Sequence, residues 1–517
     1  MADVGSSGPT FDVVVIGAGS SGSVIAARAS ENPNLTVALV EAGPDYPALA
    51  ETPWDLVNSH DNSYVDHDWR FSYTPASTSP ATAFPRGRVT GGSSAVNTTI
   101  ALRGMPEDYD GWAAAGNPEW AWPNVLRAFC RMERDLDFGD APFHGDAGPI
   151  SIRRYPESEM TEPQQAFLAA ADDLGYPACP DANDPDGWGA GPHPMNKLGR
   201  VRISTAVGYL APARVRPNLT ILPDRPVRRL LLEGKRVTGV EVDGPNGTER
   251  VHGRVVVLSA GAIQSPAILM RSGIGPKGQL DGLGLDAVAE VAGVGQNLCD
   301  HPAVAVVAQA RDASMVDRDL PIIQNILRYT APGSEHRNDL QIEPLTFAGR
   351  AAPGAALFGI AAVLEHTYGR GQVRLASADP SEGPLIEPHF GEDERDNSRL
   401  AACLLDTVRF LEAAPIADLV EEVHFPRLPL TLDGAMAIVA KRAGSGYHPC
   451  GTCRMGPEGD AGAVVDQYGR CHTVDGLVVA DASIMPEVPR ANTNLTAIMI
   501  GEMVGEWVRT EPSRFGL

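Results

Sequence analysis

The chain begins with alternating patterns of buried strand and helix. Residues 11–16 form a short apolar run, rich in β-branched side chains and bounded by glycine, which predicts a buried strand. A stretch from about residue 21 to residue 30 has apolar side chains on one side and predicts a helix. Residues 36–41 are again apolar and end in an acid, which predicts a second buried strand. Together these patterns predict a β–α–β unit.

A glycine-rich turn joins the first predicted strand to the helix. Gly17, Gly19 and Gly22 have the spacing G-x-G-x-x-G. Such glycines let the backbone turn sharply and approach a pyrophosphate, and the helix N-terminus offers free N–H groups. Glu41 follows Gly22 by about 20 residues, where a carboxylate can accept a hydrogen bond from a ribose hydroxyl. The triplet alone also fits an ordinary turn, but with both strands and the acid it predicts a dinucleotide site.

Two later segments show the periodicity of amphipathic helices. Residues 399–412 place apolar side chains at helical intervals, and Ser398 precedes them as a candidate N-cap. Near the C-terminus, Thr493 or Asn494 can cap a helix with one apolar face. That face consists of Leu495, Ile498, Met499, Met503 and Trp507.

Length and charge narrow the classes of function. A chain of 517 residues is too long for one small core, and roughly three domains are the prior expectation. Lys and Arg number 42 against 65 Asp and Glu, which gives a net charge of −23. A strongly anionic surface repels phosphate backbones, so we expect no nucleic-acid partner.

Neither the N-terminus nor the apolar runs predict export or membrane insertion. Residues 1–10 are polar and contain no Lys or Arg, unlike a signal peptide. The longest apolar stretch near the middle, residues 355–364, is about half of what a membrane-spanning helix needs. The seven cysteines lack the spacing of a disulfide scaffold. We therefore expect a soluble, cytoplasmic protein without a membrane span.

Further blocks of glycine and histidine recur along the chain. The most specific is residues 261–275, which directly follow an apolar strand pattern at 255–258. The others are residues 86–97 (RGRVTGGSSAVN), 209–214, 294–301, 448–456 (HPCGTCRMG), 478–486 and 491–495. In this order the blocks resemble the glucose–methanol–choline (GMC) family of flavin oxidoreductases. The resemblance covers almost the whole chain, is weakest from about 310 to 440, and looks closest to bacterial choline dehydrogenase-like and aryl-alcohol or hydroxymethylfurfural oxidase-like members.

The resemblance implies the fold class and the division of the chain. The expected fold is α/β, with a Rossmann-like FAD-binding domain and a discontinuous α+β substrate domain built on an antiparallel sheet. We assign residues 1–155, 200–310 and 445–517 to the FAD-binding domain. Residues 156–199 and 311–444 are assigned to the substrate-binding domain.

The resemblance also implies FAD as the cofactor. In the family, the segment that matches residues 87–100 lies over the isoalloxazine ring and pyrophosphate, and the Val227 position contacts the adenine end. Some relatives attach FAD to a histidine where this chain has Val96, which is no nucleophile, so we expect non-covalent FAD. The expected cofactor-binding residues are Gly17, Gly19, Ser20, Ser21, Gly22, Glu41, Ala42, Arg88, Val89, Gly91, Gly92, Ser93, Asn97, Thr98, Thr99, Ile100, Val227, Ala260, Gly261, Asp481, Ala482, Asn492 and Thr493.

Two residues near the C-terminus carry the expected chemistry. Oxidation of an alcohol removes its hydroxyl proton and sends a hydride from carbon to the flavin, so the protein has to supply a base. Histidine suits this role because its ordinary pKa lies near neutral pH. His448 matches the catalytic histidine of the family, and Asn492 matches a second residue that is His or Asn among members. An amide can donate to the substrate oxygen but cannot take up its proton, so the base is His448.

Other candidate groups receive structural interpretations. His301 belongs to a family block but is expected to be structural, near the boundary of the flavin domain. Cys450 and Cys453 form a C-x-x-C pattern that also fits a redox pair or half of a zinc site. No second pair lies at metal spacing, so we expect packing and no metal. Nothing in the sequence marks Glu343 or Glu365 as a ligand for a cationic alcohol such as choline.

Three functions are compatible with these motifs. The first is FAD-dependent oxidation of a small-molecule alcohol to an aldehyde or ketone, with oxygen or a quinone-type molecule as the electron acceptor. The second is a hydroxynitrile lyase of the same family with a structural flavin. The third, a flavin-binding protein without chemistry, is disfavoured by the intact pair of His448 and Asn492. We expect the first, and the motifs do not separate an oxidase from a dehydrogenase.

Overall fold

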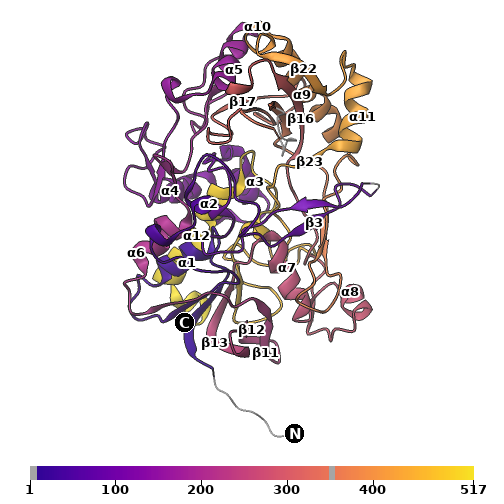
Figure 1. Ribbon diagram of the computed structural model, residues 1–517. Helices are drawn as coiled ribbons and strands as arrows, with labels where there is room; N and C mark the ends of the chain where they lie inside the picture. The colour runs from indigo at the N-terminus through magenta and orange to yellow at the C-terminus, as the bar shows by residue number, and fades with distance from the viewer. Residues whose placement is uncertain (1–7, 78, 349–355) are drawn as a thin grey trace.

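The computed structural model describes residues 8–77, 79–348 and 356–517 of the chain. Two seven-stranded sheets lie toward opposite ends of the molecule (Figure 1). Most of the polar N-terminal stretch and the first residue of the apolar stretch 355–364 lie outside the described residues. Within the described ranges, none of the helices combines the length and the apolarity needed to cross a bilayer.

The first sheet contains the predicted β–α–β unit. The parallel strands of this sheet are rich in valine. They are buried on both faces, because helices cover them. A long strand, β13, continues the sheet into an antiparallel meander at one edge. The strand order is β10 (Leu219–Leu222), β2 (Val37–Val40), β1 (Thr10–Ile16), β13 (Gly247–Leu258), β12 (Arg236–Gly244) and β11 (Val227–Glu233), with β24 (Leu477–Val479) parallel to the end of β13.

Two helices from opposite ends of the chain pack together beside this sheet. They are α1 (Gly22–Ala29) and α12 (Thr493–Thr510). A Cβ on Gly501 of α12 would lie 2.7 Å from the Ser21 carbonyl oxygen, so glycine permits the close approach. Ser21 Oγ also donates to the Ala497 carbonyl at 2.7 Å. The two helix N-termini are therefore held side by side.

The start of α12 differs from the prediction. Asn492 is its N-cap residue and Thr493 its first helical residue, so the predicted caps Thr493 and Asn494 are both wrong. The Asn492 side chain makes no capping hydrogen bond to the helix backbone, because its amide nitrogen lies against His448.

The second sheet is antiparallel and carries helices on its outer side (Figure 1). Among them is α9 (Glu394–Glu412), which packs on β19. The predicted cap Ser398 is wrong, since Asp393 caps α9 by accepting from the backbone of Arg395 and Asp396. The strand order is β22 (Val420–Phe425), β16 (Pro302–Ala310), β19 (Leu357–Leu364), β18 (Leu340–Leu345), β17 (Asn325–Tyr329) and β7 (Gly189–Pro192), with β23 (Gly444–Ser445) beside β16.

The two sheets agree with the expected fold class, a Rossmann-like part joined to an antiparallel part. The strands of the second sheet come from the predicted substrate segments, except β16 and one of the two residues of β23 at their borders. β16 lies within residues 200–310, which we assigned to FAD binding, but it pairs with β19. A sheet partner far along the chain decides this placement, and no local pattern encodes it. The division into two binding domains stays a prediction.

Candidate active site

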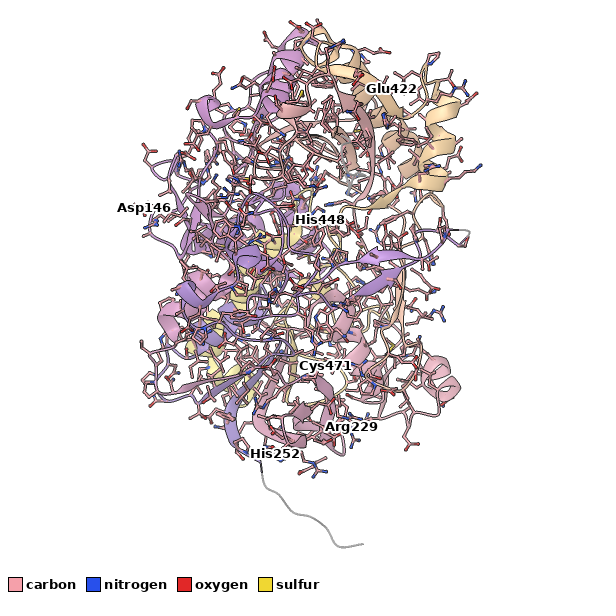
Figure 2. The ribbon with its side chains drawn as sticks, viewed as in Figure 1. Asp146, Arg229, His252, Glu422, His448 and Cys471 are labelled. Atoms are coloured by element: carbon pink, nitrogen blue, oxygen red, sulfur yellow. The ribbon has the colours of Figure 1, made fainter. Side chains whose placement is uncertain are left out.

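A cavity of about 750 Å³ extends from the first sheet to the second. At one end it meets the carboxyl ends of β1 and β2, the edge at which open α/β sheets bind their ligands. At the other end β18 and β19 of the second sheet form its wall. His448 lies in the middle of the molecule, between the two sheets (Figure 2), and lines this cavity.

Glu41 lies at the end of the cavity near β2. Its carboxylate accepts hydrogen bonds from the backbone N–H groups of Ala18 at 2.8 Å and Gly43 at 2.9 Å. Burial raises the pKa of Glu41 to about 7, although both backbone donors act in the opposite direction. The acid thus fixes the glycine-rich turn and still faces the cavity, where a hydroxyl donor can reach it.

Two glycine-rich loops touch beside the N-terminus of α1. Gly92 has a φ of +52°, and a Cβ there would lie 2.6 Å from the Gly19 Cα. The N–H of Gly91 donates to the Ala18 carbonyl at 2.7 Å. Only glycine allows both backbones to come this close. The segment 86–97 is therefore held against the turn that precedes α1.

Asp481 connects two further segments of the cavity wall. Its side chain accepts from the Gly261 N–H at 2.8 Å, from Ser265 Oγ at 2.6 Å and from the Ser483 N–H at 2.7 Å. Burial raises its pKa. The predicted residues Gly261 and Asp481 are thus brought together across more than 200 positions of sequence.

Most of the predicted site residues line this one cavity. Four do not: Gly22, Val89, Gly91 and Thr99. The predicted residues that do line it are Gly17, Gly19, Ser20, Ser21, Glu41, Ala42, Arg88, Gly92, Ser93, Asn97, Thr98, Ile100, Val227, Ala260, Gly261, Asp481, Ala482, Asn492, Thr493 and His448.

The four predicted residues that do not line the cavity support its loops from the protein interior. A Cβ on Gly22 would lie 1.9 Å from the Gly17 carbonyl oxygen, so this glycine permits tight packing of the turn. Val89 is fully buried in a small apolar cluster, and Thr99 is buried in a left-handed conformation with φ +63°. Their side chains support the walls and do not face the cavity.

His448 lies between two side chains, one on each ring nitrogen. Its Nε2 is 3.0 Å from Nδ2 of Asn492, and its Nδ1 is 2.9 Å from Nδ1 of His301. Burial is the largest cause that holds the pKa of His448 well below its ordinary value, followed by electrostatic interactions with His301 and Arg86. The imidazole is therefore neutral at neutral pH, the form that a base requires.

His301 lies closer to the reacting end than its structural interpretation implied. Its ring is fully buried and contacts His448 directly. The neighbouring Asp300 accepts from the backbone N–H groups of His301 and His448, both at 2.8 Å, and from Ser445 Oγ. Burial raises the pKa of Asp300 to about 6. These hydrogen bonds fix the segment before β16 against the segment that carries His448.

Part of the cavity wall consists of residues to which the sequence motifs gave no role. Four aromatic side chains contribute to it: Tyr64, Trp69, Phe71 and Tyr447. From the second sheet come Gln341 and Glu343 of β18 with Ala361 and Val363 of β19. Alternation along β18 places Gln341, Glu343 and Leu345 on the cavity side, so a strand prediction for residues 340–345 could have found them.

The cysteine pair and one acidic cluster have structural explanations. Cys450 and Cys453 are buried and free, and the Cys450 thiol hydrogen-bonds with that of Cys299. One group in the described part of the chain has the spacing of metal ligands, namely Glu133, Asp135 and His144. Arg103 and Arg154 already form ion pairs with its carboxylates. Two guanidinium charges oppose a cation there, so the residues present do not suit a metal.

The cavity suits a long dinucleotide such as FAD. One end offers the Glu41 carboxylate and the N-terminus of α1, whose first N–H groups have no partner within the helix. The start of α12 offers Asn492 Oδ1 and Asn494 Nδ2, buried polar atoms without a hydrogen-bond partner among the described residues. A Rossmann-like sheet, a long cavity and an imidazole in its wall are the features of an FAD-dependent oxidoreductase.

Comparison with known proteins identifies the family. The chain belongs to the GMC oxidoreductase family, whose N-terminal and C-terminal models match residues 11–303 and 367–501. It is 34% identical to 5-(hydroxymethyl)furfural oxidase of Methylovorus sp., over 97% of this chain and 99% of that protein. It is 33% identical to oxygen-dependent choline dehydrogenase 1 of Chromohalobacter salexigens, over 96% of this chain and 95% of that protein.

The solved structures agree with this assignment. Pyridoxine 4-oxidase from Mesorbium loti superposes with a TM-score of 0.88 at 31% identity, covering 96% of this chain and 98% of that one. The predicted family, fold class and FAD cofactor are thereby confirmed, as is an oxidoreductase of CH–OH donors. None of the relatives named here is a lyase, so the hydroxynitrile lyase alternative has no support.

Proposed function

We propose that this enzyme oxidises a hydroxymethyl group on a flat aromatic or heteroaromatic ring to the aldehyde, with His448 as base. The observation that carries the proposal is the cavity wall of Tyr64, Trp69, Phe71 and Tyr447, which shares one cavity with His448 and Asn492. Aromatic side chains bind flat rings by stacking and edge contacts. The substrates named for two relatives, 5-(hydroxymethyl)furfural and pyridoxine, also carry hydroxymethyl groups on heteroaromatic rings.

Each residue of the reacting end has a distinct task in this proposal. Bound FAD supplies the acceptor for the hydride that leaves the carbinol carbon. His448 Nε2 accepts the hydroxyl proton, and Asn492 Nδ2 donates to the substrate oxygen. Arg86 packs against the Phe84 ring at 4.5 Å and donates to the Tyr447 carbonyl at 2.9 Å, which fixes the segment next to His448.

Glu343 indicates which second substituent on the substrate ring the enzyme prefers. Its Oε1 accepts from Gln341 Nε2 at 2.5 Å and lies 3.2 Å from Nε2 of His193. The carboxylate lines the cavity wall, where it can accept a hydrogen bond from a hydroxyl or amine on the substrate ring. We infer a preference for rings that carry such a second donor over unsubstituted benzyl alcohol.

The test is anaerobic mixing of the purified holoenzyme with a panel of benzylic, heteroaromatic, aliphatic and amino alcohols. We expect the visible absorption of the oxidised flavin to bleach fastest with ring alcohols that carry a second donor, and Glu343→Gln to remove that preference. Faster bleaching with choline or simple aliphatic alcohols would contradict the proposed substrate class. Reoxidation of the bleached enzyme by air or by a quinone then tests the inferred acceptor, oxygen or a quinone-type molecule.

We infer the cytoplasm as the compartment of this enzyme. All seven cysteines are free, which supports a reducing environment. Fractionation of the source cells, with the holoenzyme traced by an antibody, tests this inference. Recovery in an exported fraction would contradict it.

A further inference from the structure

The two nitrogens of His448 face partners that constrain its single proton. Nε2 lies 3.0 Å from the Asn492 amide nitrogen, which donates and cannot accept. A neutral imidazole carries one proton, so an accepting Nε2 requires that proton to be on Nδ1. His448 Nδ1 lies 2.9 Å from Nδ1 of His301. His301 Nδ1 therefore has to be the acceptor, and the His301 proton belongs on its Nε2.

The surroundings of His301 fit this arrangement. Burial lowers the pKa of His301 to about 3, so its ring is neutral and has one free acceptor nitrogen. The backbone of Glu365 and of Pro489 opposes this lowering, although His301 Nε2 has no hydrogen-bond partner among the described residues. His301 can thus accept from His448 without becoming charged.

A third group, Glu365, lies next to the same nitrogen. Its Oε2 is 3.5 Å from His301 Nδ1, and its side chain is 1% exposed. Neither carboxyl oxygen has a hydrogen-bond partner among the described residues. A buried carboxyl group without partners is unusual and calls for an explanation.

The charge of Glu365 decides where the proton between the two rings lies. A neutral Glu365 leaves His301 Nδ1 free to accept from His448. An ionised Glu365 attracts a proton to His301 Nδ1, and His448 Nδ1 then has to accept. The proton of His448 would move to Nε2, the atom that has to accept from the substrate. Ionised Glu365 is therefore incompatible with His448 acting as the base.

We propose that His301 and Glu365 are positioning residues that together set which nitrogen of His448 carries the proton. The proposal rests on His448 being the base of the proposed function. Burial raises the pKa of Glu365 to about 8, which keeps it neutral at neutral pH. The groups that face it are Arg328, which favours ionisation, and Glu343, Asp108 and Asp300, which oppose it.

The first test compares His301→Leu with the matched variant His301→Asn. Leucine removes the acceptor, whereas the asparagine Oδ1 takes about the place of His301 Nδ1. Loss of one such hydrogen bond corresponds to about a tenfold change in rate. We expect His301→Leu to lower the rate constant of flavin reduction at pH 7 about tenfold or more, with substrate Kd nearly unchanged. His301→Asn should retain most of the rate, and equal losses in both variants would contradict a role in accepting the proton.

The second test is the pH dependence of flavin reduction in wild type and Glu365→Gln. Glu365 is neutral below its raised pKa and ionised above it. The wild-type rate should therefore fall as the pH rises through about 8. Glutamine cannot ionise, so the fall should disappear in Glu365→Gln. The same alkaline fall in both proteins would overturn the part assigned to Glu365.

The two tests separate this inference from the proposed function. If His448→Ala reduces flavin as fast as wild type, the proposed base is wrong and the inference fails with it. If His448→Ala is slow but His301→Leu reduces at the wild-type rate, and Glu365→Gln keeps the alkaline fall, only the inference fails. FAD content and melting temperature of each variant identify unfolded protein. If the His301→Leu variant folds poorly, the pH profile of Glu365→Gln decides whether the inference holds.

Discussion

At the scale of single residues, the proposed chemistry depends on what surrounds His448. In serine hydrolases a carboxylate accepts from the imidazole that acts as base. Here the nearby carboxylate, Asp300, accepts from backbone N–H groups and Ser445, while the neutral ring of His301 faces His448 Nδ1. A neutral partner stabilises an imidazolium less than a carboxylate does. His448 therefore holds a transferred proton weakly, which suits a base that has to release it in every turnover.

Asn492 should matter less than the base itself. Asn492→Ala removes the N–H donor that lies 3.0 Å from His448 Nε2. We expect flavin reduction to slow by roughly tenfold, the size typical of losing one positioned hydrogen bond, with FAD still bound. Stopped-flow reduction under anaerobic conditions measures this effect. A rate equal to wild type would show that the amide does not contact the substrate oxygen.

The role of a residue could be predicted from the sequence only where the residue lies in a motif that resembles one of the family. His448 and Asn492 are predicted because their blocks resemble those of the family, and the structure brings the two side chains into contact. The contact of His301 with His448 could not be predicted, since it depends on how two distant segments meet at Asp300. Gln341 and Glu343 lie in the region of weakest resemblance, and only the alternation along β18 marks them.

At the scale of elements, glycines set how closely the cofactor loops approach α1. Gly92→Ala places a Cβ 2.6 Å from the Gly19 Cα and puts alanine in a left-handed conformation. That conformation alone costs about 1–2 kcal/mol for a non-glycine residue. We therefore expect FAD affinity to fall about tenfold or more, since about 1.4 kcal/mol corresponds to a tenfold change.

Titration of the apoprotein with FAD, followed by flavin fluorescence, measures that affinity. Gly111→Ala is the matched control, because a Cβ at Gly111 of α3 (Pro106–Ala114) meets nothing within 4 Å. The control should bind FAD like wild type. Unchanged FAD affinity in Gly92→Ala would show that the two loops do not form the cofactor site together.

Elements with strong periodicity could be predicted, but their ends could not. Every limit of the first β–α–β unit lies within one residue of its predicted place. Helix α9 begins five residues before its predicted start, because Asp393 supplies a better-placed cap than Ser398. The N-cap of α12 is Asn492, whose side chain serves the site instead of the helix. Tertiary contacts decide such boundaries.

At the scale of the whole molecule, the site exists only where the two sheets meet. The first sheet presents the carboxyl ends of β1 and β2, and the second contributes the wall of β18 and β19. Ligand sites commonly form at such junctions and at the carboxyl ends of parallel strands. β16, which the sequence analysis assigned to the cofactor domain, pairs with the distant strand β19, because a strand at a junction can take partners far along the chain.

The mode of FAD attachment is a property of the whole holoenzyme. Val96 lines the cavity at the position where some relatives have a linking histidine, and its side chain has no nucleophile. We expect denaturation followed by ultrafiltration to release all the flavin into the filtrate. Flavin that stays with the denatured chain would contradict non-covalent binding. Readdition of FAD to the apoprotein should raise its melting temperature, because a ligand that binds only the folded state stabilises it.

The central claim is that His448 takes the hydroxyl proton of an alcohol bound in the cavity between the two sheets. The most direct measurement is the rate constant of anaerobic flavin reduction by an aryl alcohol in wild type and His448→Ala, at equal FAD content. Loss of a general base lowers such a rate by about 100-fold or more, and we predict a decrease of that size with FAD retained. Reduction of His448→Ala at the wild-type rate would contradict the account.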